Sequence, residues 1–86
     1  MWYLYIIESI EKGRWYIGIS QDMDRRLSQH NHGKVKSSKP YRPYQLVYFE
    51  KYSTKSEACK REIQVKRSGA IRKQIKGLVK KQGPIV

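Results

Sequence analysis

Two segments near the start of the chain alternate their side chains as β-strands do, and this leaves few folds open. Residues 2–8 read Trp-Tyr-Leu-Tyr-Ile-Ile-Glu and residues 14–20 read Arg-Trp-Tyr-Ile-Gly-Ile-Ser, a period-2 pattern rich in aromatic and β-branched residues. Lys12-Gly13 between them suits a tight turn, because glycine accepts positive φ. We expect an antiparallel hairpin that pairs residues whose numbers sum to 25, as 12 and 13 do. Any odd sum puts Tyr5 and Tyr16 on the same face.

One further strand and a first helix are predicted in the middle of the chain. Residues 44–51 combine aromatic and β-branched side chains and predict a third strand beside the hairpin. A stripe at helical spacing follows Ser20 and Asp22, either of which can cap a helix, and it ends by His32-Gly33. The stripe consists of Met23, Arg26, Leu27 and His30.

The last third of the chain predicts two more helices. Ser53 or Thr54 caps the first of them, and its inward face is expected to carry Ala58, Glu62, Val65 and Gly69. A shorter helix follows, with an apolar side made of Ile71, Ile75, Leu78 and Val79. We expect residues 82–86 to form a loose tail. The fold class is α/β: a small three-stranded, mainly antiparallel sheet flanked by helices, as a single domain over residues 1–86.

A large excess of positive charge indicates the kind of partner. Nineteen Lys and Arg against seven Asp and Glu give a net charge of +12. On a folded domain such an excess is typical of nucleic-acid binding, because each cation that meets a phosphate releases counterions. No apolar run approaches the roughly 18 residues of a membrane span. A nucleic acid is therefore the expected partner, with no membrane and no obligate protein partner.

The start of the chain and its single cysteine predict the compartment. Residues 1–7 lack the basic and small-residue features of a signal peptide and fit a strand instead. Cys59 has no second cysteine with which to form a disulfide, which fits a reducing interior and a packed thiol. We expect a cytoplasmic protein.

Two basic segments predict contacts with phosphate. Residues 33–43 are rich in glycine, proline and serine and predict an exposed loop, with the cations Lys34, Lys36, Lys39 and Arg42. The polar side of the last helix adds Arg72, Lys73, Lys76, Lys80 and Lys81. Lys66 is open to three interpretations: it holds a phosphate, it orients Glu62, or it is a solvated charge.

Arg26 and His30 lie four residues apart on a helical stripe that should be buried. One interpretation is an exposed edge that carries one more solvated arginine. The other is a shared anion site, because a guanidinium matches phosphate in shape and a histidine can shuttle a proton near neutral pH. The pair at this spacing favours the anion site.

Glu62 is an inward-facing carboxylate in a chain with few acids. One interpretation is a structural ion pair with Arg26 or a lysine, since a buried carboxylate normally has a partner. The other is a ligand for a hard cation, because Mg²⁺ commonly takes one or two carboxylates and completes its shell with water and phosphate oxygens.

Tyrosines are common in strands, so packing alone can account for Tyr3, Tyr5 and Tyr16. Gly18 favours a functional interpretation, because a glycine within a strand on the tyrosine face forfeits packing and lets another backbone come close. Signatures of metal fingers, P-loops, dinucleotide loops and serine triads are absent from the sequence.

Five elements in order resemble the GIY-YIG endonuclease superfamily, and above all its small single-domain bacterial branch. They are Tyr3-Leu4-Tyr5, Tyr16-Ile17-Gly18, Arg26, His30 and Glu62. The resemblance runs from about residue 2 to residue 77, and the first motif departs from Gly-Ile-Tyr. It implies catalytic roles for Tyr5, Tyr16, Arg26, His30 and Glu62, and a place for Gly18 beside the nucleic acid.

The resemblance implies metal-dependent hydrolysis of DNA phosphodiester bonds, of the kind used in DNA repair or recombination. Glu62 would hold one Mg²⁺ or Mn²⁺, either Tyr5 or Tyr16 would deprotonate the attacking water, Arg26 would stabilise the transition state, and His30 would relay a proton. The alternative is a basic module that binds DNA or RNA on the same fold without catalysis.

Overall fold

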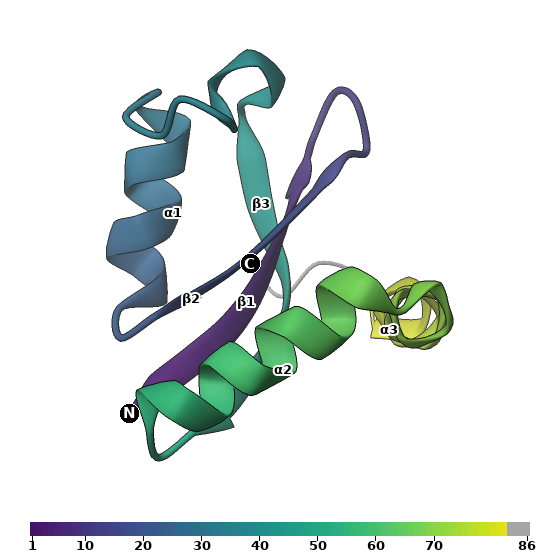
Figure 1. The fold of residues 1–86 in the computed structure, drawn as a ribbon. Helices are drawn as coiled ribbons and strands as arrows, with labels where there is room; N and C mark the ends of the chain where they lie inside the picture. Colours follow the sequence, from purple (N-terminus) through teal and green to yellow (C-terminus); the bar gives the residue numbers. More distant parts are fainter. Residues whose placement is uncertain (83–86) are drawn as a thin grey trace.

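The computed structural model describes residues 1–82 and confirms the predicted fold class: a three-stranded antiparallel sheet flanked by three helices (Figure 1). The elements are β1 (Trp2–Ser9), β2 (Trp15–Ser20), α1 (Met23–Asn31), the 3₁₀ helix η1 (Lys39–Tyr41), β3 (Tyr44–Tyr52), α2 (Lys55–Arg67) and α3 (Gly69–Gln82). The strand order is β2-β1-β3, so β1 is central. The loose tail expected over residues 82–86 lies outside the described residues, apart from Gln82 at the end of α3.

The hairpin forms, but its register differs from the expected one. Tyr5 pairs with Gly18 and Ile7 with Tyr16, so paired residue numbers sum to 23 rather than 25. The turn is longer than two residues, because the Gly13 amide donates to the Ser9 carbonyl at 2.8 Å and Gly13 takes a φ of 69°. The sum is still odd, so Tyr5 and Tyr16 share a face, as predicted.

The central strand β1 is buried on both faces and divides the apolar side chains into two small cores. Leu4 and Ile6 point to one side and pack with side chains of α2 and α3, Val65 and Ile75 among them. Tyr5 and its neighbours point to the other side, where Met23 and Leu27 of α1 cover them. Figure 1 shows α1 on one side of the sheet and α2 with α3 on the other.

Capping residues set the helix boundaries. The Asp22 side chain accepts from the Arg25 amide at 3.0 Å and begins α1, and Thr54 begins α2 through a reciprocal capping box with Glu57. The expectation that Gly69 lies on the inward face of α2 is wrong. Extended backbone at Ser68 ends α2, and Gly69 is the exposed first residue of α3.

The last helix is longer than predicted. It has 14 residues against 13 in α2, and Ser68 Oγ accepts from the Ile71 amide at its start. Ile75 is buried as expected, but Leu78 is 48% exposed. The apolar side of α3 therefore meets the sheet over only part of its width.

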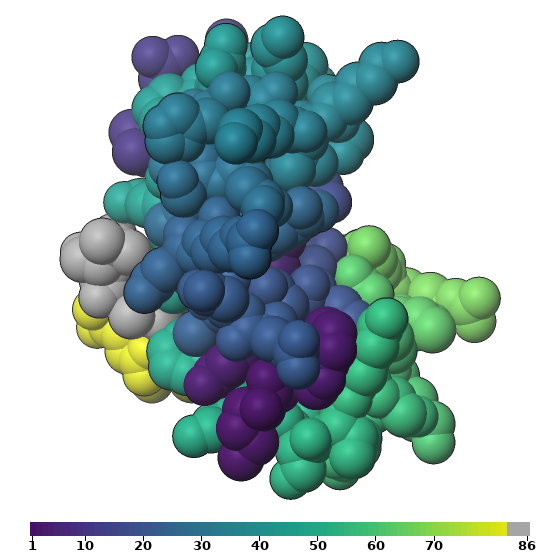
Figure 2. Space-filling view, turned by 90° about the vertical axis from the view of Figure 1, so that its left-hand side faces the viewer, coloured from purple at the N-terminus to yellow at the C-terminus, as the bar shows by residue number. Residues whose placement is uncertain are grey.

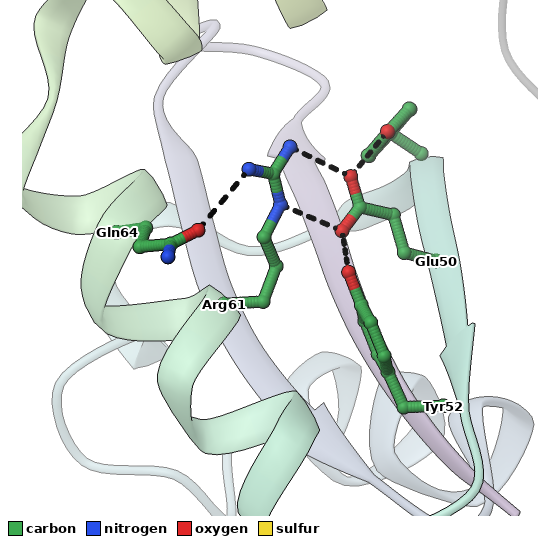
Figure 3. Close-up of polar contacts among 5 residues, drawn as sticks. Glu50, Tyr52, Arg61 and Gln64 are labelled. Atoms are coloured by element: carbon green, nitrogen blue, oxygen red, sulfur yellow. Dashed lines mark hydrogen bonds and ion pairs between the residues drawn. The ribbon is translucent and has the colours of Figure 1, made fainter.

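A hydrogen-bonded carboxylate fastens α2 to β3 (Figure 3). Arg61 donates to both oxygens of Glu50, from Nε at 2.9 Å and from Nη2 at 3.1 Å. The hydroxyls of Tyr48 and Tyr52 donate to the same carboxylate at 2.5 and 2.6 Å. Burial disfavours the charged form of Glu50, but the hydrogen bonds from Arg61 and the tyrosines outweigh burial and hold the Glu50 pKa below its usual range.

Candidate active site

Tyr5 and Gly18 face each other across the β1–β2 pair. A Cβ atom on Gly18 would lie 2.6 Å from Tyr5 Oη and 2.8 Å from Cζ, so the glycine makes room for the phenol ring. Gly18 is buried beneath that ring and does not lie open to nucleic acid as predicted. The absence of a side chain at Gly18 leaves the space that the Tyr5 ring fills.

The Tyr5 hydroxyl meets a buried histidine on the opposite element. Tyr5 Oη lies 3.0 Å from His30 Nε2, and the side chains are 2% and 0% exposed. Burial raises the pKa of Tyr5 to about 12; Arg26 opposes this shift, and the charges of Tyr16 and Glu62 add to it. Tyr5 therefore carries its proton at neutral pH.

His30 has no contact with solvent and is neutral. Burial, with the Arg26 charge adding to it, lowers the His30 pKa to about 4, and the second ring nitrogen lies 2.6 Å from Ser38 Oγ. Both ring nitrogens are thus engaged within the protein. The predicted anion site shared by Arg26 and His30 is therefore wrong in respect of His30. Its geometry allows His30 either to accept from or to donate to Tyr5, depending on which ring nitrogen carries the proton.

Tyr16 and Arg26 complete the cluster from β2 and α1. The Tyr16 ring packs on His30 with 4.5 Å between ring centroids, and within residues 1–82 no hydrogen bond joins its hydroxyl to another side chain. Arg26 is half-buried, donates to Gln29 Oε1 at 2.9 Å, and acts on the pKa of both Tyr5 and His30. We define the tyrosine cluster as Tyr5, Tyr16, Arg26 and His30.

An open cleft lies beside Arg26. Its volume is about 370 Å³, and Trp2, Ser20 and Gln29 are among the other residues that line it. Figure 2 looks at this side of the molecule, with α1 in the middle, the 33–43 segment above it, and the first residues of β1 beside α2 below. A charged substrate that enters the cleft meets a guanidinium whose stem is partly buried.

Glu62 reaches the same region from α2. Its carboxylate is close enough to Tyr5 to raise the pKa of that phenol, and its Oε2 lies 3.2 Å from Lys66 Nζ. The side chains of Glu62 and Lys66 are 21% and 53% exposed, so this is a surface ion pair of small energy. Lys66 therefore contacts the Glu62 carboxylate, which is the contact that a lysine orienting Glu62 would make.

The donor set around Glu62 fits one kind of metal ion. Residues 1–82 gather no group of three or more His, Cys, Asp or Glu side chains that could hold a metal ion. A single hard oxygen ligand at a partly open position fits Mg²⁺ or Mn²⁺, which keep several waters and accept phosphate oxygens. Glu62 is suited to such an ion.

The predicted basic residues fall into two groups on opposite sides of the sheet. Lys34, Lys36, Lys39 and Arg42 are exposed near α1, whereas Lys73 and Lys76 are exposed on α3, which packs on the other face. Arg72 donates to the carbonyls of Val65 and Lys66 at 2.8 and 2.5 Å and so caps the end of α2. Only the first group lies on the same side of the sheet as the tyrosine cluster.

Two sets of residues around the site were not identified from sequence. Ser38 is 1% exposed within a segment predicted to be exposed throughout, because the segment folds over His30 and includes η1. The Glu50–Arg61 pair sets the rotation of α2 immediately before Glu62. The alternation of Tyr48, Glu50 and Tyr52 on one strand face was a signal for the second set; Ser38 offered none.

The comparison with known families agrees with this geometry. The GIY-YIG catalytic domain matches residues 1–74. This chain belongs to the GIY-YIG family. Membership points to a nuclease that binds nucleic acid, and the predicted resemblance is confirmed. None of the helices over residues 1–82 is long and apolar enough to cross a membrane.

Several bacterial relatives share most of the chain. A UPF0213 protein of Staphylococcus saprophyticus is 45% identical over 65 residues, which is 74% of this chain and 78% of the relative. A UPF0213 protein of Staphylococcus aureus is 43% identical over the same shares. The solution NMR structure of a UPF0213 protein from Bacillus halodurans superposes with a TM-score of 0.54 at 35% identity and covers 96% of this chain and 87% of that one. The GIY-YIG member is thus similar to small bacterial proteins of this group.

Proposed function

We propose that this GIY-YIG protein is a divalent-metal-dependent endonuclease that hydrolyses phosphodiester bonds of DNA. The observation that carries the proposal is the buried hydrogen bond between the Tyr5 hydroxyl and neutral His30 beside Arg26. A buried phenol needs a hydrogen-bond partner in any fold, but a group that moves a proton next to a phosphate needs a nearby cation as well as an acceptor, and Arg26 supplies that cation.

The two tyrosines divide the work at the attacking water. Tyr5 has a raised pKa and keeps its proton, so it takes a proton from water only if it passes its own to His30. Tyr16 is half-buried and has no hydrogen bond to a side chain within residues 1–82, which leaves its hydroxyl to orient the water. We assign the transfer to Tyr5 and the orientation to Tyr16.

Arg26 supplies positive charge where the transition state gains negative charge. Its guanidinium lines the cleft and lies within electrostatic reach of Tyr5 and His30. A fixed cation at a partly dry site stabilises a pentavalent phosphate more than the ground state. Loss of this side chain should therefore lower kcat more than it raises KM.

Glu62 would hold the Mg²⁺ or Mn²⁺ ion, and when bound the ion supplies charge neutralisation at the scissile phosphate. Lys66 lies on the same carboxylate and would be displaced toward solvent or toward a phosphate oxygen. Lys34, Lys36, Lys39 and Arg42 on the same side of the sheet would hold the DNA backbone through phosphate contacts.

One observation favours the alternative of a non-catalytic, basic DNA- or RNA-binding module. Glu62 is paired with Lys66, and a carboxylate engaged in this way needs no metal. The Lys66 side of the ion pair is 53% exposed, so loss of the pair on metal binding costs about 1 kcal/mol or less. In such a module the Tyr5–His30 bond would only satisfy two buried polar groups. The match to the GIY-YIG catalytic domain over residues 1–74 favours the nuclease.

The test is cleavage of duplex, nicked, flapped, branched and single-stranded DNA, with and without Mg²⁺ or Mn²⁺. We expect metal-dependent cleavage with a preference for one structure, as in DNA repair or recombination, and a loss of about 10²- to 10⁴-fold in rate for Tyr16→Phe. Tyr41→Phe, another half-buried tyrosine on the same side of the sheet, serves as the control. DNA binding without cleavage of any substrate would establish the binding module instead.

A further inference from the structure

We propose that Ser38 is a positioning residue that holds His30 protonated on Nδ1, so that Nε2 accepts the Tyr5 hydroxyl proton. Ser38 and His30 are 1% and 0% exposed. Ser38 Oγ lies 2.6 Å from His30 Nδ1, and His30 Nε2 lies 3.0 Å from Tyr5 Oη. The three side chains form an unbroken buried chain from the 33–43 segment to the sheet.

Only one direction of hydrogen donation along Ser38, His30 and Tyr5 gives every hydrogen an acceptor. With His30 protonated on Nδ1, the imidazole donates to Ser38, the Ser38 hydroxyl donates to the Val35 carbonyl at 3.3 Å, and Tyr5 donates to Nε2. Every hydrogen then has an acceptor. With the opposite tautomer, Ser38 donates to Nδ1 and Nε2 donates to Tyr5, and within residues 1–82 no acceptor remains for the hydroxyl hydrogen of Tyr5. Leaving a buried donor without an acceptor is costly.

Ser38 is itself held in place from three sides. Its amide donates to the Val35 carbonyl at 3.2 Å, and its carbonyl accepts from Tyr44 Oη at 3.0 Å. The backbone of Tyr44 is in turn bonded twice to the Asn31 side chain, at 2.6 and 3.1 Å. Asn31 follows His30 directly in α1. The segment that carries Ser38 is thus fastened to the helix that carries His30, which fixes the hydroxyl against the imidazole.

The tautomer of His30 decides whether a proton can pass from Tyr5 to His30. This role of the transfer rests on the proposed nuclease function. As an O–H bond of the attacking water breaks, an O–H bond forms on Tyr5. The original Tyr5 O–H bond breaks, and an N–H bond forms on His30 Nε2. The water becomes hydroxide and the neutral imidazole becomes imidazolium. With Nε2 already protonated the second transfer has no acceptor, and Tyr5 cannot receive the proton from water.

His30 is neutral in the resting protein. Burial and the Arg26 charge lower its pKa to about 4, so the resting imidazole has one ring proton and a free lone pair. An imidazolium formed during the reaction returns its proton to Tyr5, as Tyr5 releases the proton it took from water to the oxygen that leaves the cleaved phosphodiester. Ser38 keeps the lone pair aimed at Tyr5 between turnovers.

Long-range ¹H–¹⁵N NMR of the metal-free protein at neutral pH tests the tautomer directly. We expect a pyrrole-type ¹⁵N shift at His30 Nδ1 and a pyridine-type shift at Nε2. His32, the other histidine, is assigned from a His32→Gln variant. A pyrrole-type shift at His30 Nε2, or an average of both forms, would overturn the proposal. Because the readout needs no cleavage, failure of the nuclease proposal leaves this test unaffected.

Variants of Ser38 test its effect. Ser38→Ala should shift His30 toward the Nε2-protonated form and lower kcat about 10- to 100-fold, with a smaller change in KM for DNA. Ser38→Thr keeps a hydroxyl and should restore the tautomer and most of the rate. The matched control is Ser28→Ala, which removes a hydroxyl 3.2 Å from the exposed His32 Nδ1 on the same helix. An unchanged His30 tautomer in Ser38→Ala would refute the role of Ser38.

Discussion

Acid should destabilise this protein through His30 well before its carboxylates titrate. Burial, aided by Arg26, lowers the His30 pKa from 6.5 to about 4, so folding favours the neutral form. The stabilisation from a lowered histidine pKa is present above about pH 6.5 and is lost as the pH falls toward about 4. Each pH unit between the two pKa values costs about 1.4 kcal/mol. Between pH 7.5 and pH 5 the free energy of unfolding should fall by about 2 kcal/mol.

Urea unfolding at half-unit steps from pH 7.5 to pH 5 measures this loss. His30→Gln removes the titrating group but keeps hydrogen-bonding atoms, so its free energy of unfolding should be nearly flat over the same range. His32→Gln removes the other histidine, which is exposed, and should keep the wild-type slope.

A wild-type profile that is flat between pH 7.5 and pH 5 would refute the reasoning. So would a His30→Gln profile as steep as that of the wild type. An NMR titration adds a direct check, because the ring signals of His30 should not move until the pH is well below 5 in the folded protein.

Three further predictions concern the space for the Tyr5 ring, the Glu50 hydrogen bonds that join β3 to α2, and the DNA contacts of the 33–43 segment. Gly18→Ala should lower the free energy of unfolding, measured by thermal unfolding, by about 1–3 kcal/mol and break the Tyr5–His30 bond, because its Cβ would lie 2.6 Å from Tyr5 Oη. Wild-type stability with full activity would contradict the claim that Gly18 leaves space for the Tyr5 ring. Glu50→Gln should lower the free energy of unfolding by about 2 kcal/mol in urea, because the substitution weakens hydrogen bonds to a largely buried charge; Glu11→Gln on the exposed hairpin turn is the control. Neutralising the four cations of the 33–43 segment should reduce the slope of the logarithm of the DNA association constant against log salt by about 3.6. The four are Lys34, Lys36, Lys39 and Arg42. An unchanged slope would show that this segment does not contact DNA.

Periodicity in the sequence was sufficient to predict the elements of the fold. The geometry of the hairpin turn could not be predicted from it. The alternation in residues 2–8 and 14–20 predicts both strands and the shared face of Tyr5 and Tyr16, because any odd register gives the same face. The register itself depends on how many residues the turn takes up, and the hydrogen bond that closes the turn at Ser9 could not be inferred from Lys12-Gly13. Helix caps at Asp22 and Thr54 were predictable because capping acts within four residues.

The environment of each site residue was the part that sequence could not supply. The i+4 spacing of Arg26 and His30 suggested a common anion site, yet burial by the 33–43 segment makes His30 a neutral, internally bonded group. Loop composition predicts exposure on average and does not identify the one serine that folds inward. The role of Ser38 depends on contacts across eight residues, and that of Gly18 depends on a ring from the neighbouring strand. Such contacts exist only in the folded chain.

The central claim is that Glu62 and the tyrosine cluster together cleave a DNA phosphodiester with a divalent ion. The most direct measurement is the single-turnover cleavage rate of Glu62→Gln, at saturating protein and over a titration with Mn²⁺. Glu11→Gln carries the same change of charge on the exposed hairpin turn and serves as the control. We predict that Glu62→Gln retains the fold and most of the DNA affinity but loses metal-dependent cleavage, because one ligand charge is removed at nearly constant shape. Equal rates and equal Mn²⁺ dependence in Glu62→Gln and the wild type would contradict the account.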